Sequence, residues 1–449
     1  MTIEKNLFSV GERVYSVDGE EFIIMSILGH GGQGEVYKVR GRNGDMAMKW
    51  YYPNRYLKKI NADIFHRNLE KNVSNGIPRL SSGDCATQFI WPEKLMYKQK
   101  GSFGYLMPLF QEGFEPLENL ILGRKKDSRT GKVTPLVWSS WYARVTAAIN
   151  IVRAFEILHA SGLSYQDVNA GGFSVNPKDG RVFICDCDNV APNGTNLGIR
   201  GVYLFMAPEV LRGEKKPDRS TDEYSLAVIL FHLFFHGHPL HGKKSRYIRT
   251  LEQYTDEEAN MMIYGTDPSY CLASEYNSNP VDPKIDTDVF RLCFVYPQIL
   301  MDAFERVFTV GTKNPSARLN ATDWRKLLLN VRDHLVQWDG KETFYGQRKQ
   351  AKLPELCRIL QYSNKQEVLC VPGKILYAYH LDPYSRDYQT VVGRIIPTKR
   401  EGVIGLHNLS GQNLSYTWQD KVGECLPDGK IPLVPGMVIK NKNISIIVK

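Results

Sequence analysis

The chain lacks the segments that send a protein into or across a membrane. The first ten residues, MTIEKNLFSV, contain no basic stretch followed by an apolar core, so a secretory signal is not expected. The longest apolar run, Tyr224–Phe235, falls far short of the roughly 20 residues that span a bilayer, and its pattern is that of a buried core helix. These absences predict a cytoplasmic protein without a membrane partner.

The chain contains few cysteines, and their spacing fits neither a disulfide framework nor a metal site. The 449 residues contain eight cysteines, and no Cys-x-x-Cys pair occurs. A disulfide framework is therefore excluded, and the ligand spacing of structural zinc is missing. Cys185 and Cys187 alternate with aspartates, so a strand there would place both thiols on one face. We interpret them as packed, reduced thiols.

The net charge is +9, but the basic residues do not gather into a nucleic-acid site. The local clusters Gly123–Lys132 and Gly242–Arg249 include glycine and serine, which is typical of exposed loops. Neither cluster interleaves with aromatic residues in a way that suggests base stacking. We therefore expect no nucleic-acid partner. The sequence also shows no internal repeat and no low-complexity tract.

The chain does show clear changes of pattern along its length. Residues 10–50 alternate like strands, Lys58–Val73 has apolar residues at helical spacing, and residues 85–110 return to strand character. From Ser139 the pattern is mostly helical, and short strand-like runs with turn residues follow the polar segment Asp339–Lys352. The predicted fold class is α+β, with a β-rich lobe at 1–110, a helical lobe at 111–338, a linker at 339–352 and a β-sandwich-like module at 353–449.

A glycine-rich turn between two predicted strands is the first candidate for nucleotide chemistry. The stretch GHGGQGEV places Gly29, Gly31 and Gly34 just before Val36. Glycines let backbone amides approach phosphate oxygens, because no Cβ stands in the way. A dinucleotide-binding fold would need a helix directly afterwards, whereas the following residues predict strand, turn and strand. The sequence therefore argues against that fold.

A second candidate is the segment LSYQDVNAGGFSV, residues 163–175, which follows a long predicted helix. Taken alone, Asp167 and Asn169 are ordinary turn residues. Their context changes this interpretation. The second strand after the glycine turn carries Lys49, and an apolar strand leads to Asp186 in VFICDCDNV.

In this order the motifs resemble those of the eukaryotic-like protein kinase superfamily. The matching positions, in chain order, are the glycine loop, Ala47-Met48-Lys49, Asp167, Asp186, Ala207-Pro208-Glu209 with Asp222, and Arg318. The residues of the catalytic segments look closest to those of divergent bacterial Ser/Thr kinases associated with tellurite-resistance and stress operons. The resemblance covers about residues 10–338 and implies a two-lobed kinase fold.

The resemblance also implies ATP and magnesium as cofactors and assigns roles to individual residues. Lys49 would position the α- and β-phosphates, and Glu70, ahead of Asp63, would be the helix glutamate that pairs with Lys49. Asp167 would orient the acceptor hydroxyl, and Asp186 would hold metal. The adenine would lie near a hinge at Met107–Leu109, between Val36 and Ala47. Asp222 would brace the catalytic loop, and Arg318 would pair with Glu209.

The chain departs from the family pattern at four positions. Gln166 replaces the arginine that clamps a phosphorylated activation segment, and Gly172 replaces the asparagine that holds one magnesium. Cys187 and Asp188 stand where phenylalanine and glycine are usual. Asn169 and Asp188 could supply the missing oxygen ligand, because magnesium needs few protein ligands. The alternative for Asp188 is plain turn chemistry.

These motifs predict an ATP- and magnesium-dependent protein Ser/Thr kinase with a protein substrate. One alternative is a nucleotide-binding pseudokinase that acts as a scaffold, which the loss at Gly172 favours. A small-molecule kinase is a second alternative, which Glu209 and Arg318 disfavour because they shape a peptide-docking lobe. The tail around Gly393-Arg394 weakly resembles a forkhead-associated sandwich. That likeness implies partner or substrate recruitment, with Arg394 as the candidate phosphothreonine ligand.

Overall fold

The computed structural model describes most of the chain as two compact units. The described residues are 7–54, 56–78, 89–127, 130–195, 197–199, 201–338, 341–346, 356–363, 366–382, 385, 387–441 and 444–449. Unit 1 comprises residues 1–139, 146–290 and 303–325, and unit 2 comprises residues 140–145, 291–302 and 326–449.

Unit 1 begins with a six-stranded antiparallel sheet, as the alternating pattern predicts. Its strands run in the order β1-β2-β3-β4-β6-β5. Their bounds are β1 Arg13–Tyr15, β2 Glu21–His30, β3 Gly34–Gly41, β4 Gly44–Tyr51, β5 Lys94–Leu95 and β6 Gly104–Met107. On one face of this sheet, side chains from different strands pack in one cluster, which includes Val14, Ile24 and Trp50. The other face packs against a helix at β4 and β6, while β1 and β2 keep exposed residues on that face.

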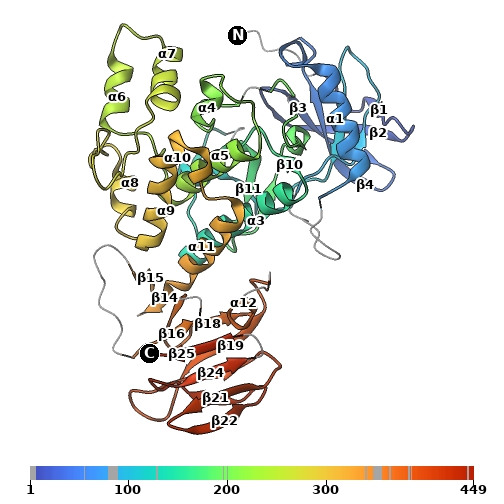
Figure 1. The fold of residues 1–449 in the computed structure, drawn as a ribbon. Helices are drawn as coiled ribbons and strands as arrows, with labels where there is room; N and C mark the ends of the chain where they lie inside the picture. Colours follow the sequence, from blue (N-terminus) through green and yellow to red (C-terminus); the bar gives the residue numbers. More distant parts are fainter. Residues whose placement is uncertain are drawn as a thin grey trace. The chain divides into compact units, whose positions relative to one another are not determined.

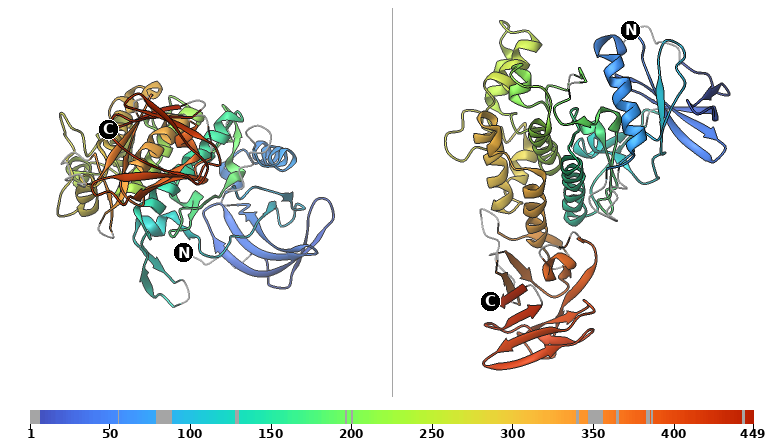
Figure 2. Two further views of the ribbon diagram at one scale, coloured as in Figure 1. Left: turned by 90° about the horizontal axis from the view of Figure 1, so that it is seen from below. Right: turned by 45° about the vertical axis from the view of Figure 1, so that its right-hand side comes forward.

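That helix, α1 (Ala62–Asn75), follows a short 3-10 turn, η1 (Leu57–Lys59), and lies alongside the sheet in both views of the ribbon (Figures 1 and 2). The sequence pattern predicted a single helix from Lys58. The helix starts later because the Asn61 side chain accepts the Ile64 N–H at 3.2 Å and caps the first turn. It ends at Gly76, whose φ of 67° suits a residue without a side chain.

The rest of unit 1 is mostly helical, and α5 is its central element. The elements, in chain order, are β7 Glu115–Pro116, α2 Leu117–Ile121, β8 Arg124–Lys126, β9 Val133–Pro135, α3 Trp141–Ala160, β10 Leu163–Ser164, η2 Ala170–Gly172, β11 Phe173–Val175, β12 Val182–Ile184, η3 Cys187–Asn189, β13 Ala191–Pro192, α4 Pro208–Leu211, α5 Arg219–Phe235, α6 Lys243–Thr250, α7 Asp256–Asn260, η4 Met261–Thr266, α8 Thr287–Leu292, α9 Gln298–Phe308, α10 Val310–Lys313, η5 Pro315–Ala317 and α11 Ala321–Asp333. Helices α3, α8, α9 and α11 continue into or lie in segments of unit 2.

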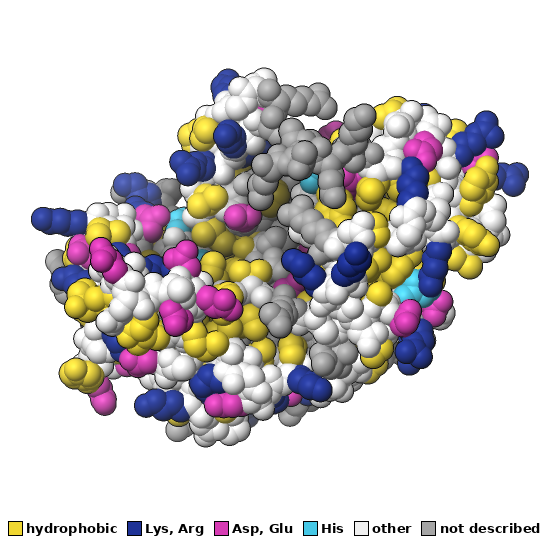
Figure 3. Space-filling model, turned by 90° about the horizontal axis from the view of Figure 1, so that it is seen from above, with side chains coloured by type: hydrophobic (Ala, Val, Ile, Leu, Met, Phe, Trp, Pro, Cys, Tyr) yellow, Lys and Arg dark blue, Asp and Glu magenta, His cyan; other side chains and the backbone are white. Residues whose placement is uncertain are grey.

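Helix α5 confirms the core helix predicted from the apolar run Tyr224–Phe235. Asp218 and Thr221 form a capping box at its start, and almost every side chain from Tyr224 to Phe235 is buried. Within the described residues, no helix has both the length and the apolar character that crossing a bilayer requires. On the face in Figure 3, Lys and Arg side chains are scattered among Asp and Glu, as the sequence interpretation expects.

A buried ion pair fixes the helical lobe near α4. The Arg318 guanidinium donates to both oxygens of Glu209, at 2.7 and 2.8 Å, and also to the Ser220 carbonyl. The Arg318 side chain is fully buried and that of Glu209 nearly so. The pair predicted from the sequence is therefore present.

Unit 2 contains a two-sheet sandwich with one shared core. The six-stranded sheet has the order β17-β16-β25-β24-β21-β22, and the four-stranded sheet has the order β18-β19-β20-β23. Buried Leu360, Val368 and Ile446 of the first sheet pack in one cluster with Ile395 and Leu406 of the second. The bounds are β14 Leu335–Trp338, β15 Lys341–Phe344, β16 Arg358–Tyr362, β17 Glu367–Cys370, β18 Ile375–Tyr377, α12 Ala378–Leu381, β19 Val391–Pro397, β20 Ile404–Asn408, β21 Leu414–Trp418, β22 Lys421–Cys425, β23 Lys430–Pro432, β24 Val438–Asn441 and β25 Ile444–Val448.

The predicted linker at 339–352 is wrong for its described part. Residues Lys341–Phe344 form β15, which pairs with β14 in an antiparallel hairpin. The reason is Phe344, which is fully buried and lies against the rings of Trp141 and Tyr296. Residues 339–340 and 347–352 of the predicted linker lie outside the described residues.

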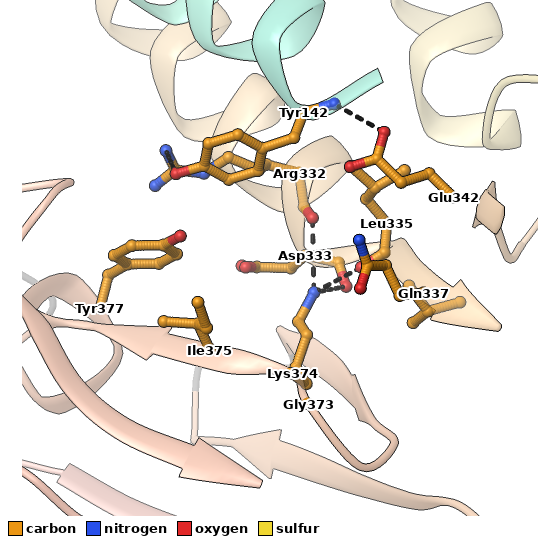
Figure 4. Close-up of a pocket in the computed structure, with 11 residues that line it drawn as sticks. Tyr142, Arg332, Asp333, Leu335, Gln337, Glu342, Gly373, Lys374, Ile375 and Tyr377 are labelled. Carbon is orange, nitrogen blue, oxygen red and sulfur yellow. Dashed lines mark hydrogen bonds between the residues drawn. The ribbon is translucent and has the colours of Figure 1, made fainter. Parts of the chain in front are cut away.

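The last turn of α11 is fastened inside unit 2, beside a cavity of about 240 Å³ (Figure 4). The Lys374 ammonium donates to the carbonyls of Asp333 and Leu335, both at 2.8 Å, and so caps the helix end. Arg332 is buried with its guanidinium over the rings of Tyr142 and Tyr377. Because these donors and rings already contact one another, we interpret the cavity as structural.

Arg394 lies in the middle of β19, where its side chain is exposed. The residue opposite it on β20 is His407. Its role in recognising phosphothreonine therefore stays a prediction.

Candidate active site

Lys49 stands at the centre of the candidate site. It lies on β4, paired across the sheet with Val36 of β3 and Tyr105 of β6, and its side chain is buried. Its ammonium contacts Gln33 Oε1 at 2.6 Å, Asp186 Oδ1 at 3.0 Å and Asp188 Oδ2 at 2.9 Å. Burial opposes the charge, but the two carboxylates raise the pKa of Lys49 above its ordinary value. Lys49 therefore stays protonated.

Asp186 is the carboxylate of this cluster that reaches solvent. It has a left-handed backbone, with φ of 48°, and its side chain is 38% exposed. Aspartate tolerates this conformation better than most residues. Among the described residues, no three His, Cys, Asp or Glu side chains form a metal-binding group. The position of Asp186 fits magnesium all the same, since that ion binds one or two carboxylates together with substrate phosphates and water.

Asp188 does not lie where a metal ligand would. Its side chain is fully buried, and Oδ2 is shared between the Lys49 ammonium and the Tyr51 hydroxyl. The interpretation of Asp188 as a magnesium ligand is therefore not supported by this geometry. The physical reason is the aromatic wall formed by Tyr51 and Tyr105, whose rings lie 6.2 Å apart and shut out solvent.

Glu70 does not meet Lys49 either. Its side chain is 49% exposed and lies 3.3 Å from His66 Nδ1, one turn earlier on α1. The face of α1 that is buried carries Phe65, Asn68, Leu69 and Asn72 instead. The predicted pairing of Glu70 with Lys49 is thus absent, because the helical phase of α1 turns Glu70 outward.

Asp167 lies in a loop that Asp222 holds in shape. Asp222 accepts the N–H of Tyr165 at 2.7 Å and that of Gln166 at 3.0 Å, as predicted for the helix-terminal aspartate. Gln166 has φ of 70°, an unusual value for a residue with a side chain. Burial and the nearby charge of Asp186 raise the pKa of Asp167 to about 6. A carboxylate poised in this range can accept a proton near neutral pH.

Asn169 and Gly172 complete the same loop. Asn169 accepts the Gly171 N–H at 3.0 Å and donates to the Asp167 carbonyl, so it caps the short turn η2. A Cβ added at Gly172 would lie 2.7 Å from the Tyr165 hydroxyl. That hydroxyl donates to the Cys185 carbonyl. Tyr165 thus occupies the space that a side chain at position 172 would need.

The predicted adenine-binding residues share one apolar cluster. Ala47 and Met107 belong to its buried part, and Val36 and Leu109 pack against it. The structure therefore brings together the residues that would contact a purine ring.

The three glycines of the loop differ in what they do. A Cβ at Gly34 would lie 2.0 Å from the Trp50 carbonyl, so Gly34 is required for β3 to pair with β4. At Gly29 and Gly31 a Cβ would meet nothing closer than 3.7 Å. These two positions are open, and they fit a role in which backbone amides approach phosphate.

Sequence reasoning missed the aromatic residues of the site. Tyr51 lies two residues after Lys49, and in a strand this spacing puts both side chains on one face. This alternation was the available signal for Tyr51. Gln33, between the glycines, and Tyr165, before Asp167, gave no comparable signal, since their contacts depend on tertiary packing.

Comparisons with known proteins concern the part of the chain that carries Asp167 and Asp186. Residues 109–306 match the protein kinase domain family, and the match begins after Lys49. This part of the chain is similar to protein kinase domains. Protein kinase YegI of Escherichia coli (strain K12) is 25% identical to the chain over 241 residues, which cover 51% of this chain and 34% of that protein. Serine/threonine-protein kinase SCH9 of Candida albicans is 24% identical over 303 residues, covering 62% of this chain and 36% of that protein.

The chain thus covers about a third of the length of these curated relatives. A crystal structure of the PknI kinase domain from Mycobacterium tuberculosis is also similar, with 17% sequence identity and a TM-score of 0.43, covering 72% of this chain and 99% of that chain. The β-sandwich of unit 2 lies outside the part of the chain that matches the kinase family.

Proposed function

We propose that this protein is an ATP- and magnesium-dependent protein Ser/Thr kinase. The observation that carries the proposal is the meeting of Lys49 and Asp186, which are 137 residues apart in sequence and 3.0 Å apart in space. Asp167 lies close enough to Asp186 for the two charges to interact. A buried cation, a half-exposed carboxylate and a poised base are the groups that phosphoryl transfer uses.

Each residue has a distinct task in the proposed reaction. Lys49 would bind the α- and β-phosphates of ATP, and Gln33 would release its contact with the ammonium. Asp167 would orient the Ser or Thr hydroxyl and accept its proton as the new oxygen–phosphorus bond forms and ADP leaves. Asp186, with Asn169 nearby, would hold magnesium, which neutralises charge on the phosphates when bound.

The setting of the reaction is also part of the proposal. We infer a cytoplasmic location, because the eight cysteines of the sequence are too few and too scattered for a disulfide framework. The sandwich of unit 2 would recruit a partner or substrate protein. A scaffold without catalysis is the second candidate, and Gly172, which offers no metal ligand, favours it.

The test is transfer of labelled phosphate from ATP to a generic protein acceptor. Wild-type protein should label serine or threonine, and Asp167→Asn should lose at least about 100-fold in rate, since it removes the proton acceptor. Unchanged labelling by Asp167→Asn would refute the role of Asp167. No labelling by the wild type, together with measurable ATP binding, would favour the scaffold.

A further inference from the structure

The acidic partner of Lys49 comes from an unexpected part of the chain. Helix α1 is described throughout, and its two acidic side chains, Asp63 and Glu70, are both exposed. Its buried residues Phe65 and Leu69 pack in one cluster with Tyr51 and Tyr105. The ring of Phe65 lies edge-on to that of Tyr51, with centroids 5.2 Å apart. An apolar and aromatic wall therefore stands where a carboxylate from α1 would have to enter.

Asp188 supplies the carboxylate for Lys49 that α1 does not. Its Oδ2 accepts from the Lys49 ammonium at 2.9 Å and from the Tyr51 hydroxyl. Lys49 is 4% exposed and Asp188 is 0% exposed, so this ion pair is shielded from solvent. Burying one of these charges without the other would be costly, because an isolated ion loses its hydration. The two residues thus depend on each other for burial.

We propose that Asp188 is the positioning residue for Lys49, and that the Tyr51 hydroxyl fixes Asp188 in turn. The inference rests on the kinase activity proposed above and replaces the role that the family resemblance gives to Glu70. Asp186 and Asp188, two aspartates in one short segment, then have different roles. Asp186 faces solvent and the metal, and Asp188 faces inward and holds the lysine.

This arrangement changes what helix α1 can control. Asn68 donates to the Val190 carbonyl at 2.7 Å, and Asn72 donates to the same carbonyl at 2.8 Å. Helix α1 therefore touches the segment that carries Asp188 through neutral amides. The charge that pairs with Lys49 thus comes from Asp188, and the contribution of α1 is packing and neutral hydrogen bonds.

The decisive comparison is between Asp188→Asn and Glu70→Gln, two changes of carboxylate to amide that preserve shape. With saturating ATP and magnesium, Asp188→Asn should lower kcat by about 100-fold, because a misplaced lysine costs that much in transition-state alignment. Glu70→Gln should stay within about twofold of the wild type, as expected for an exposed contact. Tyr51→Phe should lower kcat by about tenfold, since it removes one hydrogen bond to a charged group.

Two further readouts separate positioning from other roles. Thermal melting should show all three variants folded, and Tyr51→Phe serves as the test if Asp188→Asn does not fold. The magnesium concentration for half-maximal rate should be the same in Asp188→Asn and wild type. A raised magnesium requirement with kcat restored at high magnesium would make Asp188 a metal ligand and overturn the proposal. An equal loss in Glu70→Gln would return the role to α1 and overturn it as well.

Failure of the proposed activity gives a different result from failure of this inference. If the wild type transfers no phosphate, the activity proposal fails, and the role of Asp188 is measured by calorimetric titration with ATP. Asp188→Asn should then weaken ATP binding by about tenfold relative to both wild type and Glu70→Gln, because the lysine no longer faces the phosphates. Equal affinities in the three proteins would overturn the inference.

Discussion

At the scale of single residues, two pairs of residues in the site constrain each other. Asp188 replaces a glycine and meets Lys49, and Tyr165 stands over Gly172. Tyr165 and Gly172 are seven positions apart in the loop, yet one excludes a side chain at the other. A side chain at position 172 should therefore not be accommodated unless Tyr165 changes too.

Gly172→Asn is the direct test of the second pair. The new Cβ would lie 2.7 Å from the Tyr165 hydroxyl, so the single variant should lose about 1–3 kcal/mol of stability through overpacking. Adding Tyr165→Phe removes that oxygen, after which the nearest ring carbon is 3.6 Å away. The double variant should melt near Tyr165→Phe, its control, and need less magnesium for activity. A single variant as stable as the wild type would contradict the steric explanation.

The pH dependence of the reaction is set by Asp167. Its pKa, raised to about 6 by burial and by Asp186, means that the carboxyl is protonated below that pH and ionised above it. Since the ionised form accepts the proton, kcat/KM should fall as pH drops through about 6 and level off above pH 7. Rates measured from pH 5 to 8 check this. A profile that is flat down to pH 5 would contradict the role of Asp167.

At the scale of elements, Val190–Met206 is the segment that the kinase resemblance assigns as the activation segment, and its described residues are held by packing and by hydrogen bonds to the backbone. Gln166 donates from its side chain to the Thr195 carbonyl at 2.7 Å, in the position where relatives use an arginine to grip phosphate. The segment also buries Leu197 and Ile199 in the cluster that contains Phe65 of α1. Order in this segment therefore comes from packing and neutral hydrogen bonds.

This predicts an enzyme that needs no phosphate on the segment. Thr195 and Tyr203 are the acceptor residues expected there, and Thr195→Ala with Tyr203→Phe should keep the rate within about twofold of wild type. Amide side chains cannot make the charge-assisted contacts that phosphate requires. Loss of activity in the double variant, with its fold and ATP affinity intact, would show that phosphorylation is needed after all.

The ion pair between α4 and the loop before α11 is a second element-scale feature. Arg318→Ala strands the buried Glu209 carboxylate and should cost about 3–5 kcal/mol of unfolding free energy. The control is Glu214→Ala, whose carboxylate contacts Arg212 at the surface and is 55% exposed. That change should cost less than about 1 kcal/mol. Similar costs for the two variants in denaturant titrations would contradict the buried pair.

At the scale of the whole molecule, the sequence predicted the architecture well and the site only in part. Alternation and helical spacing were enough to predict the β-sheet and the helical part of unit 1, because those patterns report burial directly. The predicted end of the helical lobe at 338 differs from the structure, in which residues 326–338 belong to unit 2. The sandwich of unit 2 followed from short strands with turns between them. The linker was mispredicted at β15, since the burial of Phe344 comes from contacts with residues distant in sequence, such as Trp141.

The site shows the same division between local and tertiary information. The family resemblance placed Lys49 and Asp186 in one site, and the structure brings the two side chains within 3.0 Å of each other. The sequence pattern failed for Glu70 and Asp188. The position of Glu70 depends on the rotation of α1 about its axis, and that of Asp188 depends on its burial behind Tyr51. Neither quantity is encoded in a local pattern. The residues on which the chemistry depends most were thus predictable, and their supporting contacts were not.

The proposed activity is phosphoryl transfer from ATP to protein hydroxyls at Lys49 and Asp186. The most direct measurement is the initial rate of labelled phosphate transfer for the wild type and for Lys49→Met, at saturating magnesium and equal protein concentration. The account predicts transfer by the wild type and a loss of at least about 100-fold in Lys49→Met, because the charge that binds the phosphates is gone. A Lys49→Met protein that labels its acceptor at the wild-type rate would contradict it.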